Sequence, residues 1–150
     1  MWTVETDGIA ATEQVGALLA RSVGGERAVV LLEGALGAGK TAFARGFLRA
    51  LGLTAAVTSP TYAIVHSHGV VSHADVYRVR DVAELEHSGI VDGVEQGTWL
   101  IEWASRFPEV WPDDHVSVAI AIGDGDQRRV TITASGPVSA AVLDRLGGSR

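Results

Sequence analysis

The stretch Gly34-Ala35-Leu36-Gly37-Ala38-Gly39-Lys40-Thr41 decides the fold, because it matches in full the phosphate-binding pattern G-x-x-x-x-G-K-[ST]. Lys40 is the only lysine among the 12 basic residues of the chain, and all the others are arginines. A compact ammonium on a flexible stem can reach between phosphates while the backbone N–H groups of the loop surround the anion. The stretch therefore predicts a phosphate-binding loop and, with it, nucleotide binding.

The residues on either side of the loop have the order that this motif requires. An unbroken apolar run at 28–32 predicts a buried parallel strand that leads into the loop. Residues 41–51 place Phe43 and Phe47 on one face of a helix, and Gly52 follows as a helix stop. Strand, loop and helix in this order favour a working phosphate loop over an incidental glycine-rich turn.

Length and composition favour one globular domain over residues 1–150. Hydrophobic residues make up 47% and charged residues 20% of the chain. The net charge of −6 argues against a general electrostatic attraction to nucleic acid, and the absence of cysteine excludes disulfides and thiolate metal sites. No apolar run approaches the roughly 20 residues of a membrane helix, and residues 1–7 carry acids where a signal peptide would be basic. We therefore expect a cytoplasmic protein.

The rest of the chain alternates between helical and strand patterns. A helix capped by Thr12 is expected to extend to Val23. Further strands are predicted at residues 55–58, 64–68, 70–77, 99–103, 115–122 and 128–134, and short helices at 81–87 and 138–146. Two pairs of strands form hairpins, one near Gly69 and one around residues 123–126. This order predicts an α/β fold, a P-loop NTPase-like three-layer sandwich with a mainly parallel central sheet and an antiparallel C-terminal hairpin.

Two carboxylates are candidates to work beside the loop. Phosphoryl transfer needs a magnesium ion, which prefers oxygen ligands. Thr41 offers a hydroxyl to this metal. Glu102, at the end of an apolar strand, offers a carboxylate that could bind the metal or position water. Asp75, which alternation places on one strand face with His73 and Tyr77, is the second candidate. Glu102 could instead be simply the first exposed residue after a strand, and Asp75 part of a half-exposed polar face. The sequence does not decide which of them orients the attacking water.

A turn and a histidine-rich segment invite further interpretations. In Ser59-Pro60-Thr61-Tyr62, Thr61 could sense the γ-phosphate, although a plain turn would have the same composition. His66, His68 and His73 lie close together and suggest zinc, but without cysteine, and divided across a hairpin, they are a poor ligand set.

Two tryptophans and two arginines complete the candidates. We expect Trp103 and Trp111 to lie in the core or to face a partner rather than to stack on a base. Arg128 and Arg129 follow a turn and could contact either nucleotide or solvent. With its one lysine at position 40, the chain has no N-K-x-D segment, which excludes a guanine-specific phosphate-loop protein.

Several segments, in order and spacing, resemble the bacterial TsaE (YjeE) family over nearly the whole chain. They are Leu32-Glu33 with the loop, Ser59-Pro60-Thr61-Tyr62, His73-Ala74-Asp75-Val76-Tyr77-Arg78, Glu84-Leu85-Glu86 before Gly89, and Ile101-Glu102-Trp103. The histidine-to-arginine hexapeptide and the Ile-Glu-Trp strand end are the most specific. Val76 stands where leucine is more usual in the family, and the preceding hairpin is short and rich in histidine, which leaves the role of that hairpin open.

The resemblance implies an ATPase, with ATP or ADP and Mg²⁺ as cofactors, that supports threonylcarbamoyladenosine modification of tRNAs reading codons that begin with A. Members of the family act on a complex of the partner proteins TsaB and TsaD and meet tRNA only through that complex. By resemblance, the phosphates are held by Gly34, Gly37, Ala38, Gly39, Lys40 and Thr41, the metal by Thr41 and Glu102, and the γ-phosphate side by Asp75 and Thr61, while Thr12 lies near the nucleotide.

The catalytic residues expected from this interpretation are Lys40, Asp75, Glu102 and Thr61. Because no arginine finger is evident near the loop, we expect slow hydrolysis by the isolated chain, with partners completing the site. Two other functions stay open on the sequence alone. One is a nucleotide-sensing interaction module whose hydrolysis is incidental, and the other is a small-molecule kinase.

Overall fold

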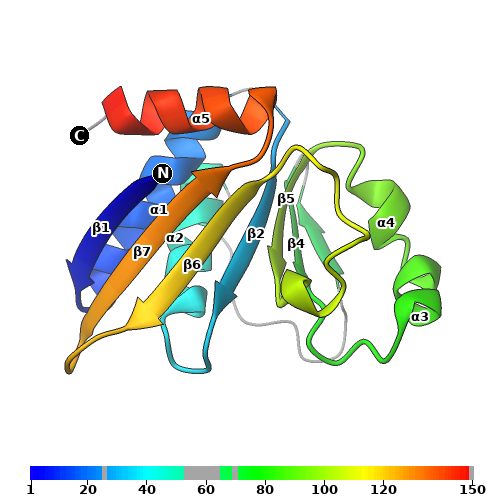
Figure 1. The fold of residues 1–150 in the computed structure, drawn as a ribbon, viewed down its shortest axis with the longest axis horizontal. Coiled ribbons are helices and arrows are strands. Elements are labelled where there is room, and N and C mark those ends of the chain that lie inside the picture. Colours follow the sequence, from blue (N-terminus) through cyan, green and yellow to red (C-terminus); the bar gives the residue numbers. More distant parts are fainter. Residues whose placement is uncertain (25–26, 53–64, 69–70, 149–150) are drawn as a thin grey trace.

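The computed structural model describes residues 1–24, 27–52, 65–68 and 71–148, which form a seven-stranded sheet flanked by helices (Figure 1). The strand order is β1-β7-β6-β2-β5-β4-β3. The strands are β1 (Trp2–Asp7), β2 (Val29–Gly34), β3 (Val65–His68), β4 (Val71–Asp75), β5 (Thr98–Glu102), β6 (Val116–Ile122) and β7 (Gln127–Ala134). The helices are α1 (Ile9–Val23), α2 (Lys40–Ala50), α3 (Val82–His87), α4 (Ile90–Gly93) and α5 (Pro137–Gly148), with a 3₁₀ turn, η1, at Ala104–Arg106.

The centre of the sheet is parallel. Strand β2 pairs in parallel with both β5 and β6, and β5 pairs in parallel with β4. Its apolar run, Val29–Leu32, is buried throughout, as expected for a strand covered on both faces. The outer pairings β1–β7, β6–β7 and β3–β4 are antiparallel. This arrangement confirms the predicted α/β fold with an antiparallel C-terminal hairpin, and it brings the carboxyl ends of β2, β5 and β4 to one edge.

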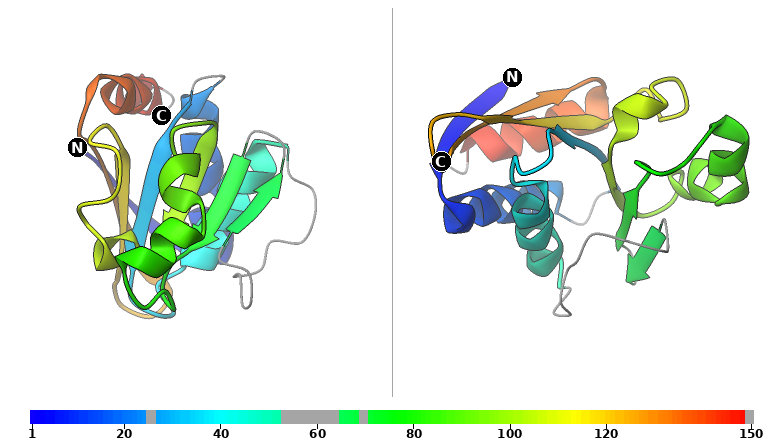
Figure 2. Two further views of the ribbon diagram at one scale, coloured as in Figure 1. Left: turned by 90° about the vertical axis from the view of Figure 1, so that its right-hand side faces the viewer. Right: turned by 90° about the horizontal axis from the view of Figure 1, so that it is seen from below.

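Helices cover the two faces of the sheet unevenly (Figure 2). Helices α1, α2 and α5 pack on one face, over a core that includes Leu19, Phe43 and Val142. On the other face, α3, α4 and the segment after β5 pack on β2, β5 and β4, with Leu85 and Trp111 in a second core. The half of the sheet that holds the phosphate loop is therefore enclosed on both sides, as a rigid support for a site requires.

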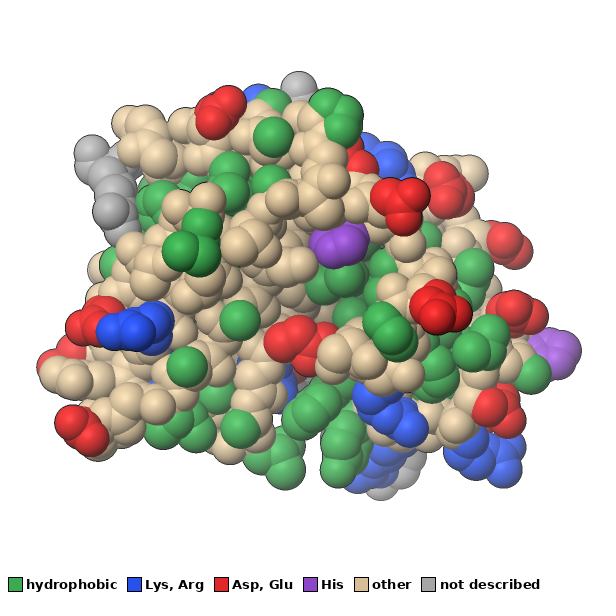
Figure 3. Space-filling model, viewed as in Figure 1, with side chains coloured by type: hydrophobic (Ala, Val, Ile, Leu, Met, Phe, Trp, Pro, Cys, Tyr) green, Lys and Arg blue, Asp and Glu red, His purple; other side chains and the backbone are tan. Residues whose placement is uncertain are grey.

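The described residues leave the outer face of β1, β7 and β6 uncovered (Figure 3). Burial alternates along these strands, so that in β1 Trp2 and Thr6 are buried while Thr3 and Glu5 are exposed. Glu5 pairs across this face with Arg129 at 2.9 Å, and both side chains are exposed. This half of the sheet thus has the one-sided pattern that is typical of antiparallel strands.

Three local predictions differ from the structure. Strand β1 was not predicted, because six residues that alternate in polarity form a stable strand only when β7 provides a partner. Helix α1 begins at Ile9, so Thr12 lies in its first turn and is not its N-cap, a position held by Gly8. The strand predicted at 70–77 ends at Asp75, and Tyr77 lies beyond it.

Other predictions lie outside the described residues: the strand at 55–58, the turn near Gly69, and Ser59–Tyr62 with Thr61. Within the part of the chain that the structure describes, no helix combines the length and the apolar character needed to cross a membrane.

Helices α1 and α2 approach each other closely through two glycines. A Cβ atom on Gly46 would lie 1.9 Å from the carbonyl oxygen of Glu13, and one on Gly16 would lie 2.2 Å from that of Phe43. Both obstacles are backbone atoms, so no side-chain rotation could make room. Arg45 reinforces the crossing through an ion pair with Glu13 at 2.8 Å. The contact fixes the position of α2 and of the phosphate loop at its N-terminus.

We predict that Gly46→Ala destabilises the protein by about 2 kcal/mol or more, because the added methyl group must push two helix backbones apart. Gly147→Ala is the matched control, since a Cβ atom there meets nothing within 4 Å and alanine is the better helix former. The control should change stability by less than about 1 kcal/mol. Urea unfolding followed by circular dichroism measures both; equal stability of Gly46→Ala and the unmodified protein would contradict the close crossing.

Candidate functional site

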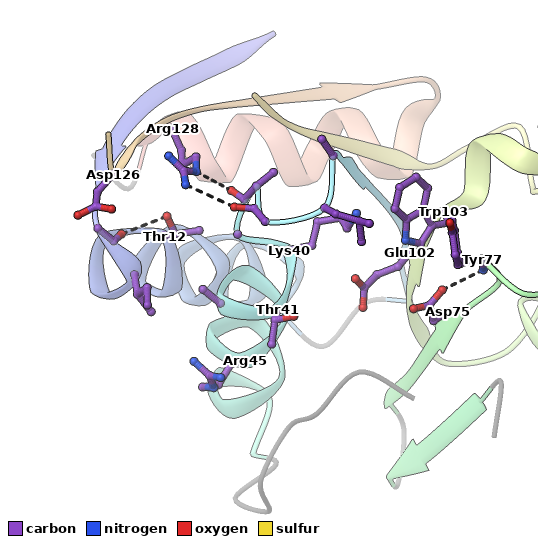
Figure 4. Close-up of a pocket in the computed structure, with 18 of the residues that line it drawn as sticks. Thr12, Lys40, Thr41, Arg45, Asp75, Tyr77, Glu102, Trp103, Asp126 and Arg128 are labelled. Atoms are coloured by element: carbon purple, nitrogen blue, oxygen red, sulfur yellow. Dashed lines mark hydrogen bonds between the residues drawn. The ribbon is translucent and has the colours of Figure 1, made fainter. Parts of the chain in front are cut away.

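A cavity of about 1010 Å³ opens at the carboxyl edge of the sheet, bounded by the phosphate loop, the start of α1, the β6–β7 turn and the ends of β4 and β5 (Figure 4). Of the residues expected at the site, those that line it are Thr12, Gly37, Ala38, Gly39, Lys40, Thr41, Asp75 and Glu102. Gly34 ends β2 just before the loop and does not line the cavity, and Thr61 lies outside the described residues. The fold thus brings together side chains from four separate parts of the chain.

Two glycines give the phosphate loop a backbone conformation that other residues rarely adopt. Gly37 and Gly39 have φ angles of +81° and +110°, in the left-handed region that other residues rarely adopt. Gly39 is the N-cap of α2, so Lys40 is the first residue of an 11-residue helix. The N–H groups of a helix N-terminus lack partners within the helix and favour a negatively charged group. The loop and the start of α2 are therefore suited to an anion such as a phosphate.

Lys40 is buried, and its ammonium has two neighbours. Nζ donates a hydrogen bond to the carbonyl oxygen of Gly34, and it lies 3.7 Å from the ring centroid of Trp103. Burial lowers the pKa of Lys40, and the negative charges nearby, Glu102 foremost, partly oppose that shift. The ammonium is therefore held where an anion in the cavity would compete with the carbonyl oxygen of Gly34 for its hydrogen bond.

Asp75 and Glu102 end two adjacent parallel strands and are direct partners in the register of β4 and β5. The carboxylate of Glu102 is buried, and its Oε2 accepts a hydrogen bond from Nε2 of His73 at 2.7 Å. Asp75 accepts a hydrogen bond from the N–H of Tyr77 at 2.9 Å. Burial raises the pKa of Asp75, and the charge of Glu102 adds to the increase. Both sequence-predicted carboxylates thus face the same end of the cavity.

The oxygen donors at this end fit a magnesium ion. Figure 4 shows Thr41, Asp75 and Glu102 directed toward one region of the cavity. A hydroxyl and two carboxylates are the hard donors that magnesium prefers, and the bond to His73 uses only one of the two carboxylate oxygens of Glu102. Among the described residues, no group of three or more His, Cys, Asp or Glu side chains is placed to hold a metal ion by itself.

Trp103 has an unusual backbone at the edge of the cavity. With φ of 63°, it is the one non-glycine residue with positive φ in the described ranges. Its ring packs on that of Tyr77, with centroids 4.8 Å apart, as well as on the ammonium of Lys40. A bulky residue in this region carries backbone strain, which persists only where the surroundings enforce it.

Two sets of hydrogen bonds hold the turn that follows β5. The guanidinium of Arg106 donates hydrogen bonds to the carbonyl oxygens of Val76 and Val79, which ties η1 to the chain after β4. Glu33, at the end of β2, accepts hydrogen bonds from the N–H of Ser105 at 2.6 Å and from its hydroxyl at 3.1 Å. These bonds hold the turn that begins at Trp103.

Sequence reasoning missed two residues of this site. It placed Trp103 in the core or at a partner surface. The residue does pack against the second core, but its ring also lies against Lys40, and its position directly after Glu102 is the signal that could have suggested this contact. Sequence reasoning left Arg128 undecided between nucleotide and solvent, and the structure places it in the cavity lining. Trp111, by contrast, is buried in the core, and Arg129 pairs with a carboxylate on the outer face.

The raised pKa of Asp75 predicts how Asp75→Asn changes stability with pH. A carboxyl group whose pKa is higher in the folded state costs stability once pH exceeds its unfolded value, and the cost is fully present above the folded pKa. Asn retains the oxygen that accepts from Tyr77. We therefore expect the variant to be more stable at pH 7 by up to about 1 kcal/mol, with the difference vanishing near pH 4.

Urea unfolding at both pH values measures this difference, and Asp124→Asn in the exposed β6–β7 turn is the control for the loss of one carboxylate. A variant that is less stable than the unmodified protein at pH 7 would show that the ionised form of Asp75 is favoured by its surroundings, contrary to the expectation.

Comparisons with known proteins agree with this geometry. A family model described as "Threonylcarbamoyl adenosine biosynthesis protein TsaE" matches residues 6–130. The tRNA threonylcarbamoyladenosine biosynthesis protein TsaE of Bacillus subtilis is 42% identical over 113 residues, which are 72% of this chain and 70% of the relative. The protein of the same name from Haemophilus influenzae is 37% identical over 115 residues, 73% of this chain and 72% of the relative.

A solved structure extends the likeness to the whole fold. The crystal structure of YdiB from Bacillus subtilis superimposes with a TM-score of 0.79 and 32% sequence identity, covering 99% of this chain and 95% of that one. The matched family region contains the phosphate loop, both carboxylates and the turn at Trp103. On these grounds the chain belongs to the TsaE family, whose members are described as threonylcarbamoyladenosine biosynthesis proteins.

Proposed function

We propose that this protein binds ATP with Mg²⁺ and hydrolyses it in support of threonylcarbamoyladenosine modification of tRNAs that read codons beginning with A, acting on a complex of TsaB and TsaD. The observation that supports this most is the placement of the phosphate loop opposite Asp75 and Glu102 across one cavity, with Lys40 between them. Membership of the TsaE family supplies the link to the modification.

The phosphate loop supplies the positive side of the proposed reaction. Its backbone N–H groups and the N-terminus of α2 bind the phosphates, and the ammonium of Lys40 exchanges the carbonyl of Gly34 for a phosphate oxygen. Hydrolysis of a phosphoanhydride needs positioning and charge neutralisation more than covalent help from the protein. A buried ammonium is more effective in that role than an exposed one.

The two carboxylates have different roles in this proposal. Glu102 is held by His73 and, with Thr41, would hold the metal, which supplies charge neutralisation at the phosphates when it is bound. Asp75 orients the attacking water, because burial raises its proton affinity and its neighbour Tyr77 fixes one of its oxygens. Thr61, which lies outside the described residues, is proposed on the γ-phosphate side by resemblance alone.

In this proposal partners complete the site, because two of the three nearby arginines are engaged elsewhere. Three arginines line the cavity: Arg128, which the sequence left undecided between nucleotide and solvent, and Arg45 and Arg78, which it did not indicate. Arg45 pairs with Glu13, and Arg128 is bonded to loop carbonyls, so neither presents its charge to a transferring phosphoryl group. An additional cation or a closed cavity supplied by TsaB and TsaD would raise a slow basal rate.

We predict that Lys40→Ala and Glu102→Gln each lower ATP hydrolysis at least about 100-fold while leaving the fold intact. Glu109→Gln, which also removes one carboxylate but lies exposed and away from the cavity, should hydrolyse ATP at the unmodified rate. Phosphate release and circular dichroism measure rate and fold. Unchanged hydrolysis in Glu102→Gln would remove that residue from the mechanism.

Addition of TsaB and TsaD should raise the hydrolysis rate at least about tenfold, since the proposed site is incomplete alone. An equal rate with and without the partners would refute the proposal that the isolated site is incomplete.

Replacing ATP by a non-hydrolysable analogue over several rounds of tRNA modification tests the role of hydrolysis: modification should stop after the first round. Continued turnover with the analogue would instead identify a nucleotide-sensing module.

A further inference from the structure

The guanidinium of Arg128 bonds to two carbonyl groups of the phosphate loop (Figure 4). Its Nε donates to the carbonyl oxygen of Ala38 at 3.1 Å, and its Nη2 to that of Gly37 at 3.4 Å. Its Nη1 donates to the carbonyl oxygens of Gly125 and Gln127 at 2.8 and 2.7 Å. One planar cation therefore joins the loop to the β6–β7 turn, across about 90 residues of sequence.

The bonded carbonyls are those that fix the direction of the loop amides. In a loop whose successive N–H groups converge on an anion, the carbonyl groups point away from it, and their orientation determines that of the N–H groups. Arg128 donates hydrogen bonds to two such carbonyls. Since its planar fork is rigid, it restricts both peptide units at once, which a flexible ammonium could not do.

The β-sheet register places Arg128 on the helix side of the hairpin. It lies opposite Thr6 in β1 and Ile122 in β6. Its neighbour Arg129 lies on the other side and pairs with Glu5 on the exposed face. The two consecutive arginines thus carry the same charge and lie in the same strand, but only Arg128 contacts the loop, so Arg129 serves as its control.

We infer that Arg128 is a positioning residue of the phosphate site, which holds the loop carbonyls so that the loop amides are arranged for phosphate before the nucleotide arrives. The effect on affinity rests on the proposed nucleotide binding, whereas the effect on the loop itself does not. Arg128 acts here through the backbone of Gly37 and Ala38, and not by touching the ligand.

Ligands with and without phosphates separate this role from direct contact with the nucleoside. Calorimetry with ADP and with adenosine should show about a tenfold loss of ADP affinity in Arg128→Ala, because the loop must be ordered during binding, and no change for adenosine. Arg129→Ala should bind both as the unmodified protein does. An equal loss for adenosine would mean that Arg128 contacts the nucleoside and would overturn the inference.

The variant Arg128→Lys tests whether the planar guanidinium is needed or only its positive charge. Lysine keeps the positive charge but is a flexible point donor, so we expect it to recover at most part of the ADP affinity. Full recovery would show that charge alone matters and would overturn the positioning role.

Backbone ¹⁵N relaxation of the nucleotide-free protein tests the same inference without any ligand. The order parameters of Gly37, Ala38 and Gly39 should fall in Arg128→Ala, from values near 0.85 for rigid backbone, and should not change in Arg129→Ala. Unchanged loop order in Arg128→Ala refutes the inference even if nucleotide binding is confirmed. Lower loop order in a variant of a protein that binds no ADP would support the positioning role of Arg128 and refute the proposed function.

Discussion

The alignment of three parallel strands is the constraint on which the site depends. Strands β2, β5 and β4 end at one edge, in a register that sets Leu32 beside Glu102 and Glu102 beside Asp75. Because a shift by one residue would move every side chain of a strand to the other face, out of the core that it packs in, this register is strongly specified. It places two carboxylates opposite a loop that concentrates positive charge, in a cavity where burial changes the pKa of Lys40 and of Asp75 in opposite directions.

What could be predicted from the sequence is what neighbouring residues determine. The apolar run before the loop, the glycines and Lys40 together specify strand, loop and helix, and the structure has all three. Glu102 at a strand end was correct for the same reason. Thr12 was placed as a cap because its hydroxyl suits that position, but Gly8 caps the helix and the Thr12 hydroxyl bonds instead to Thr6.

What could not be predicted depends on contacts between distant segments. Strand β1 exists through its pairing with β7, and Arg128 meets the loop only because β7 lies next to β1 and β6 in the sheet. The backbone of Trp103 is held in its strained form by Arg106 and Glu33, residues whose partners lie on other strands and turns. No local pattern contains these relations, although polar residues immediately after a buried strand did indicate the region of the site.

The uncovered outer face of β1, β7 and β6 gives the two halves of the sheet different resistance to local opening. The enclosed half buries apolar side chains on both faces, whereas this half buries them on one, so the free energy needed to separate β1 from β7 is lower than that needed to separate β2 from β5. Arg128 belongs to the half that opens more easily and is bonded to a loop that the other half supports. A ligand that fixed the loop would therefore also slow amide hydrogen exchange in β7, through the bonds of Arg128 to the loop.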